Sequence, residues 1–311
     1  MNILISVLIP TYNPNKLNLI RTLNALKFQT LKTNIWELII IDNCSSDKEY
    51  IYSFDISWHT NAKIIRENNI GLTNARVAGI NESKGEYIVF VDDDNILEKD
   101  YLKNICIIFS QYKNMGAIGG KSIPDYETKP EPWFYKTGIR LGCRDFGDET
   151  YIYTSDDFKK ERTYPEKAPI GAGMCLRRCS AVEYVNSLDN SDNILDRTGN
   201  VLSSGGDCDI NLTLLSKGWS VGYFPNLKLF HIIPSKRLTK LYLSELSYSS
   251  SKSWIQVLKK HKICKLKEIS AFMILPRKIK AMFTYKPWKN ELSYIRWKGA
   301  CGIFDGQIKI K

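Results

Sequence analysis

The sequence predicts an α/β protein with a mostly parallel sheet flanked by helices, because strand-like and helix-like segments alternate over its first 95 residues. Continuous apolar runs, "ILISVLI" at 3–9 and "WELIII" at 36–41, are typical of strands buried on both faces. Between them, residues 16–30 repeat apolar side chains at helical spacing. Such sheets bind ligands outside the carboxyl ends of their strands.

The later segments continue this alternation. A short strand is expected at "AKIIREN" (62–68), a helix over 71–83 and a fourth strand at "EYIVFVDDDN" (86–95). Further on we expect a helix over 100–112, a glycine-rich strand edge over 115–124, a strand and helix over 168–185, a glycine turn and helix over 203–219, and a final strand or two over 221–234. Residues 125–168 are poorly periodic, which predicts a long loop or insertion over the site.

The composition is that of an ordinary globular protein, with 43% hydrophobic and 25% charged residues, which argues against disorder and against a fibrous fold. The 311 residues suffice for one large domain or two small ones. The N-terminal apolar run has no basic region before it, so it predicts a buried strand and not a signal peptide. No apolar stretch approaches the roughly 18 residues of a membrane span. The eight scattered cysteines favour reduced thiols in a cytosolic protein.

The net charge of +11 is concentrated near the C-terminus. Residues 231–311 contain 18 Lys/Arg and 4 Asp/Glu, a net charge of +14, whereas the preceding residues carry −3. Two stretches there, 238–261 and 266–283, are amphipathic and basic. This pattern favours helices on an anionic membrane surface; the alternative is a solvated basic face packed on the rest of the chain. No nucleic-acid-binding motif accompanies the charge, so no nucleic-acid partner is expected.

Polar side chains follow three predicted strands at their carboxyl ends, in "TYN" (11–13), "DNCS" (42–45) and "DDDN" (92–95). A solvated loop would explain one such cluster, but three at one edge of a sheet favour a ligand site. Consecutive carboxylates suit Mg²⁺ or Mn²⁺, which take further ligands from substrate phosphates. Because the chain has no GxxxxGK[ST] loop, we expect metal-mediated phosphate binding, most simply of a nucleoside diphosphate.

Four motifs, in order and spacing, resemble those of the family 2 glycosyltransferases, which have the GT-A fold. They are "SVLIPTYN", "LIIIDNCSSD", "NNIGLTNARVAGINESKGEYIVFVDDDN" and "GGDCDINLTLLSKGW", and the resemblance covers residues 4–235. It implies a GT-A (Rossmann-like) catalytic domain over 1–235, followed by a basic helical region over 236–311. It also implies a metal-dependent enzyme that transfers a sugar, with inversion, from a nucleotide donor, most simply a UDP-sugar.

The resemblance assigns roles to individual residues. The nucleotide-sugar would contact residues at three strand ends and on one helix: Pro10, Thr11, Tyr12, Asn13, Asp42, Asn43, Arg76, Asp92 and Asp93. The residues at 10–13 and 42–43 would line the nucleobase pocket, and Asp93 would contact the ribose. Asp94 would bind the metal, Mn²⁺ or Mg²⁺, and His231 would be a second ligand or would touch the diphosphate. Asp207 would be the general base that deprotonates the acceptor hydroxyl.

Alternatives remain open at several positions. Asp209 could be the base, since the residue before Asp207 differs from the family's usual Glu. Asn43 stands where the family often has a second Asp, which leaves the nucleobase contact and the donor open. His231 could be an ordinary hydrogen-bonding residue, and Arg76 a surface charge.

The expected acceptor is a glycan or a lipid-linked glycan in surface-polysaccharide synthesis, with the protein in the cytoplasm and peripheral on the inner face of the membrane. A nucleotidyltransferase that makes the activated sugar would also combine an α/β sheet with Mg²⁺. However, "IPTYNPNKLN" lacks the glycine- and lysine-rich loop expected of it. A non-catalytic membrane scaffold would have little reason to keep acidic clusters at three strand ends.

Overall fold

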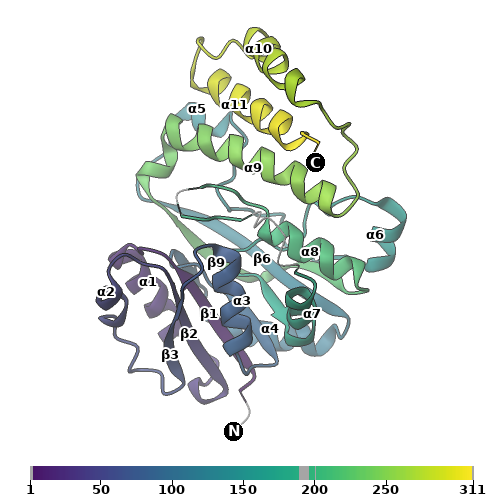
Figure 1. Cartoon of the computed structure of the whole chain (residues 1–311). Helices are drawn as coiled ribbons and strands as arrows, with labels where there is room; N and C mark the ends of the chain where they lie inside the picture. Colours follow the sequence, from purple (N-terminus) through teal and green to yellow (C-terminus); the bar gives the residue numbers. More distant parts are fainter. Residues whose placement is uncertain (1–2, 189–195, 200, 310–311) are drawn as a thin grey trace. The chain divides into compact units, whose positions relative to one another are not determined.

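The structure, a computed structural model, describes residues 3–188, 196–199 and 201–309. The chain forms two compact units, each built from three segments. The first unit comprises Met1–Asp125, Gly142–Asn193 and Asp207–Ile232, and the second comprises Tyr126–Leu141, Ile194–Gly206 and Ile233–Lys311. In Figure 1 the strands β1 to β3 belong to the first unit, and the helices α9, α10 and α11 to the second.

One half of the sheet is parallel, as the sequence predicts. Its strands are β1 (Ile5–Thr11), β2 (Trp36–Asn43), β3 (Ala62–Glu67) and β4 (Tyr87–Phe90), in the order β3-β2-β1-β4. All three pairings are parallel, and every residue of β1, β2 and β4 is buried. Thr11 pairs with Asp42, so β1 and β2 end side by side. This register brings the first two polar clusters to one edge of the sheet.

The rest of the sheet makes it mixed. The order continues from β4 to β8 (Cys175–Arg177), β6 (Met115–Tyr126), β9 (Ser220–Ile233) and β5 (Asn95–Leu97), and β7 (Tyr151–Tyr153) pairs with β9. The pairings of β8 with β4 and β6 are antiparallel, as are those of β9 with β5 and β7. The prediction of mostly parallel strands therefore holds for the first four strands only. Segment periodicity shows that a strand is buried but not its direction.

The sheet alternates its side chains between two helical layers, because successive strand residues point to opposite faces. Ile5, Val7 and Ile9 of β1 join one core cluster with α1 (Lys16–Lys27) and α4 (Tyr101–Gln111). On the other face, α3 (Leu72–Glu82) packs against β1 and β2, and a Cβ at Gly79 would lie 2.9 Å from Leu8. Other helices that lie wholly or mostly in the first unit are η1 (Thr33–Ile35), α2 (Lys48–Tyr52), α6 (Ser155–Glu161), α7 (Arg178–Asn186) and α8 (Gly206–Ser216).

The predicted loop at 125–168 contains short elements that its sequence does not reveal. They are α5 (Pro132–Tyr135), β7 and α6. Elements of three to seven residues are too short to show a period. Thr154 and Asp157 form a capping box that starts α6, since each side chain bonds the other's backbone N–H.

The C-terminal part of the second unit is helical, as predicted. It contains η2 (Ser235–Leu238), α9 (Lys240–Lys260), η3 (Ala271–Met273), α10 (Ile274–Tyr285) and α11 (Glu291–Gly306). The sequence pattern indicates the first two long helices but not α11, whose glycines weaken its helical signal. These glycines let α11 pack closely on α9: a Cβ at Gly302 would lie 2.1 Å from the Tyr248 carbonyl oxygen. Within the described residues no helix combines the length and apolar character needed to span a bilayer.

Substituting Gly302→Ala is expected to destabilise the second unit by about 1–3 kcal/mol, because the added methyl group forces α9 and α11 apart. Helix propensity alone would instead stabilise the protein by about 1 kcal/mol. Urea unfolding measures the sign directly. Arg296→Ala, at an exposed position on the same helix, is the matched control and is expected to change stability by less than about 0.5 kcal/mol. A stabilised Gly302→Ala variant would contradict the close packing.

Candidate active site

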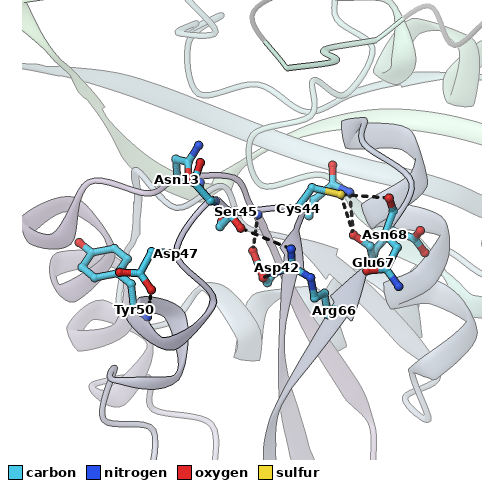
Figure 2. A network of polar contacts seen from close by, with 11 residues as sticks. Asn13, Asp42, Cys44, Ser45, Asp47, Tyr50, Arg66, Glu67 and Asn68 are labelled. Atoms are coloured by element: carbon cyan, nitrogen blue, oxygen red, sulfur yellow. Dashed lines mark hydrogen bonds and ion pairs between the residues drawn. The ribbon is translucent and has the colours of Figure 1, made fainter.

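A polar network holds together the loops that follow β1, β2 and β3 (Figure 2). Asp42 is fully buried (0% exposed) and its carboxylate is paired with the Arg66 guanidinium from β3. It also accepts a hydrogen bond from the Ser45 amide (3.0 Å). Asn13 joins the network through two hydrogen bonds of 2.9 Å. Its backbone N–H donates to the Ser45 hydroxyl, and its side-chain oxygen accepts from the Ser46 backbone N–H. The network satisfies a buried charge and fixes the strand-end loops.

Asn43 connects the end of β2 to the loop before α3. Its side-chain oxygen accepts from the Gly71 amide (2.7 Å), and its side-chain nitrogen donates to the carbonyl groups of Asn69 (2.8 Å) and Glu67 (3.3 Å). An ionised aspartate has no donor for those two carbonyl groups. These two donated hydrogen bonds explain why asparagine suits position 43, where family 2 glycosyltransferases often have aspartate.

The residues predicted to bind the nucleotide differ in their access to solvent. Pro10 and Thr11 are buried, whereas Tyr12 and Asn13 are exposed at the strand ends. The Thr11 hydroxyl donates to the Asp93 carboxylate at 2.5 Å, which joins the first and third polar clusters. Tyr12, at 40% exposed, is therefore an aromatic side chain of this set that a ligand can reach from solvent.

The three aspartates form a tight turn between β4 and β5. The Asn95 amide donates to the Asp92 carbonyl group (3.0 Å), and the Asn95 side chain donates to the Asp94 carboxylate (3.1 Å). Because β5 then pairs with β9, with Asn95 opposite His231, the turn lies beside the histidine. His231 Nε2 is 3.3 Å from Asp94 Oδ1, and both side chains are buried. The structure thus brings the two predicted metal ligands together.

The other ring nitrogen of His231 faces Cys143, with Nδ1 and Sγ 3.9 Å apart. Gly142, at φ 75°, allows this approach, because a Cβ there would lie 3.1 Å from the imidazole ring. Burial would lower the pKa of His231, but the Asp94 carboxylate and, after it, Cys143 raise this pKa to about 10. A metal ion would require the neutral imidazole and would take the place of this proton.

The donor set fits a metal that shares its coordination with substrate. The Asp94 carboxylate suits Mn²⁺ or Mg²⁺ together with phosphate oxygens and water, whereas the His231 imidazole is more typical of a transition metal such as Mn²⁺ than of Mg²⁺. In the described part of the chain, no group of three or more His, Cys, Asp or Glu side chains is arranged to hold a metal ion.

Arg76 and Asp207 meet at Gly171. The Gly171 amide donates to Asp207 Oδ2 (3.1 Å), and a Cβ at Gly171 would lie only 2.6 Å from the Arg76 guanidinium. Arg76 is buried, lies over the Phe90 ring at 5.0 Å from its centroid, and approaches the Asp92 carboxylate to 4.0 Å. It is therefore a buried cation beside the acidic turn and not a surface charge. A cation, a carboxylate and the acidic turn converge here from three distant parts of the chain.

The two candidate bases have different surroundings. Both lie in the first turn of α8, as predicted. Asp209 is buried and accepts a hydrogen bond from the Tyr184 hydroxyl (3.3 Å). Asp207 is partly exposed, and apart from Gly171 its carboxylate accepts from its neighbour's amide, that of Cys208 (2.8 Å). Asp207 is thus accessible to a substrate, whereas Asp209 is buried and links α8 to α7 through Tyr184.

Sequence reasoning missed Gly171, Cys143 and Arg144. Arg144 is buried, donates to the Gly120 and Ala168 carbonyl groups, and holds the segment that leads to Gly171. Burial lowers the pKa of Arg144, and nearby tyrosines and Asp207 partly oppose this shift. No local spacing marks these residues, because their importance comes from contacts across the sheet.

This combination of a mixed α/β sheet and acidic strand-end turn defines a GT-A glycosyltransferase fold. The sequence model described as Glycosyl transferase family 2 matches residues 6–184, more than half of the chain. The chain belongs to this family.

Two curated relatives align with parts of the chain. Poly(ribitol-phosphate) beta-N-acetylglucosaminyltransferase TarS of Staphylococcus aureus is 26% identical over 137 residues, which cover 40% of this chain and 24% of TarS. O-antigen chain rhamnosyltransferase WbaN of Salmonella anatum is 29% identical over 161 residues, covering 50% of this chain and 46% of WbaN. The aligned residues thus span 24% of the length of TarS and 46% of the length of WbaN.

Solved structures show the same fold over nearly the whole chain. S. aureus TarS 1–349 in complex with UDP-GlcNAc superimposes with a TM-score of 0.54 at 14% identity, covering 98% of this chain and 90% of that one. GalNAc-T7 with UDP, GalNAc and Mn²⁺ gives a TM-score of 0.58 at 16% identity, with 97% and 55% covered. At such identities the likeness concerns the fold alone.

Proposed function

We propose that the protein is an inverting glycosyltransferase that moves a sugar from a nucleoside-diphosphate donor, a UDP-sugar, to a glycan or lipid-linked glycan in surface-polysaccharide synthesis. The observation that carries the proposal is the meeting of Arg76 and Asp207 at Gly171, beside Asp92. A cation for the departing diphosphate and a base for the incoming hydroxyl thus both adjoin Gly171. The catalytic domain comprises residues 1–235 and the basic helical region residues 236–311.

In this reaction Asp207 accepts the proton of the acceptor hydroxyl. The acceptor oxygen forms a bond to the anomeric carbon, and the bond from that carbon to the diphosphate oxygen breaks on the opposite face. The configuration inverts, and the nucleoside diphosphate leaves with the bonding electrons. Arg76 stabilises the negative charge that develops on the diphosphate; its burial strengthens this effect by excluding water.

The residues around the strand ends would hold the nucleotide and the metal. Tyr12 and Asn13 contact the base, above a floor formed by Pro10, Asp42 and Asn43, while Thr11 orients Asp93 toward the ribose. Asp94 and His231 would hold Mn²⁺ or Mg²⁺, which neutralises charge on the diphosphate when bound. Support for this assignment comes from TarS and GalNAc-T7, whose structures are described with UDP-GlcNAc and with UDP and Mn²⁺.

A thermal-shift titration with UDP, GDP, dTDP and CMP, each with and without Mn²⁺, tests the proposal. UDP with Mn²⁺ is expected to stabilise the protein by about 2.7 kcal/mol at one hundred times its Kd. Asp94→Asn should remove the Mn²⁺-dependent part of the shift. Asp148→Asn, at a carboxylate whose side chain is 93% exposed, is the control and should keep it. A folded protein that responds to none of the nucleotides would contradict the proposal.

A further inference from the structure

A row of large apolar side chains on the second unit projects into solvent. They belong to η3, α10 and the turn that follows: Phe272 (87% exposed), Leu275 (66%), Ile279 (45%), Phe283 (63%) and Trp288 (64%). Isolated exposed apolar residues are ordinary, but a contiguous row marks an interaction surface. We call these five residues the apolar row.

Helix geometry places the apolar row along one side of α10. Leu275, Ile279 and Phe283 are spaced by four residues, so they lie one above another on the helix surface. The opposite side packs on the second unit: Ala281 is buried, and Lys278 pairs with Asp305 of α11 at 2.8 Å. The Phe283 and Trp288 rings meet edge to face at 6.3 Å, which extends the row beyond the helix. The helix is thus anchored on one side and apolar on the other.

Basic residues border the apolar row. Between residues 270 and 290 the chain has five Lys/Arg and no Asp/Glu. Lys278 is used in the pairing with Asp305, and Arg277, two residues from both Leu275 and Ile279, is exposed on the opposite side of α10. The other three, Lys280, Lys286 and Lys289, are exposed and available to the row. An apolar stripe bordered by cations is the arrangement of a helix that lies in the interface of an anionic bilayer.

The structure separates α10 from the other amphipathic stretch. Four apolar residues of α9, Leu243, Leu246, Ile255 and Val257, are buried, and α9 packs along α11. Leu241, in the first turn of α9, is the exception at 72% exposed. The apolar face of α9 is therefore already covered within the second unit. Of the two stretches in which the sequence predicts membrane-seeking helices, only the second presents an extended apolar surface.

We propose that η3, α10 and Trp288 dock on an anionic lipid surface, with the apolar row in the headgroup–acyl boundary and Lys280, Lys286 and Lys289 on the headgroups. A helix of 12 residues, about 18 Å long, can lie in this boundary but cannot cross it. A second copy of the chain is a poorer occupant, because it would bring two cationic faces together. The inference rests on the proposed function, since a lipid-linked acceptor requires the enzyme at the membrane surface.

Sedimentation with vesicles of phosphatidylcholine, with and without about one third phosphatidylglycerol, tests the docking. The intact protein should bind only the anionic vesicles, and increasing salt should release it. Lys280→Gln/Lys286→Gln/Lys289→Gln should lower the partition coefficient about fivefold per residue, roughly 100-fold in total. Phe272→Ser/Phe283→Ser should lower it at least about tenfold. Leu17→Ser/Phe28→Ser, in the first turn and at the C-cap of α1, replaces side chains that are 71% and 73% exposed, and should leave binding unchanged.

The outcomes separate this inference from the proposed function. If the intact protein shows the Mn²⁺-dependent UDP shift but does not bind anionic vesicles, the docking is wrong and glycosyl transfer stands. If it binds vesicles through α10 but responds to no nucleotide, the docking stands and the transferase proposal fails. A change of oligomeric state in Phe272→Ser/Phe283→Ser, without any vesicle binding by the intact protein, would assign the surface to a second copy and overturn the lipid proposal.

Discussion

Asp207→Asn is expected to lower kcat about 10³-fold while leaving folding and the Mn²⁺-dependent affinity for UDP unchanged. Asparagine keeps the size of the side chain and an oxygen that can accept from the Gly171 amide, but it cannot take a proton at neutral pH. The loss should therefore appear in turnover and not in donor binding. Measured kcat for transfer from a UDP-sugar, together with the UDP thermal shift, separates the two effects.

Asp209→Asn is the matched control, because it makes the same change two residues away in the same helical turn. Its side-chain oxygen can still accept the Tyr184 hydroxyl, so we expect kcat to fall by less than about tenfold. The reverse result, with a large loss in Asp209→Asn and a small one in Asp207→Asn, would transfer the catalytic role to Asp209.

The parallel half of the fold could be predicted because its evidence is local. The buried strands β1, β2 and β4 are continuous apolar runs, and α1 has helical periodicity with Asn15 at its N-cap. The antiparallel half could not, since strand direction depends on pairing between distant segments such as Cys175 with Val89. The sequence predicts one strand over 86–95, whereas β4 ends at Phe90 and a separate β5 begins at Asn95, because the aspartates form a turn whose hydrogen bonds close on Asn95.

The candidate site shows the same division. The resemblance to family 2 glycosyltransferases indicated Asp94, His231 and Asp207, and their residue types suit the expected chemistry. The proximity of Arg76 to Asp207 arises only through Gly171, which no pattern marks. Likewise, the charge count indicated a basic C-terminal region, but only packing shows which helix leaves its apolar side uncovered.

Arg66→Met is expected to destabilise the first unit by about 3–5 kcal/mol, because it leaves the Asp42 carboxylate buried without its cation. Asp42 is 0% exposed, so water cannot replace the guanidinium unless the strand ends open. Lys63→Met on the same strand is the matched control. Its partner Glu82 is 54% exposed, and the loss of such a surface pair should cost less than about 1 kcal/mol. Urea unfolding measures both.

The double variant Asp42→Asn/Arg66→Met distinguishes the structural role of Asp42 from a role in nucleotide binding. Asparagine keeps an acceptor for the Ser45 amide and removes the uncompensated charge, so the double variant should recover at least about half of the stability lost in Arg66→Met. If its UDP affinity also equals that of the unaltered protein, Asp42 acts by fixing the strand-end loops. Recovered stability with weakened UDP binding would instead mean that the Asp42 carboxylate contacts the base. An Arg66→Met variant no less stable than Lys63→Met would show that Asp42 does not depend on Arg66.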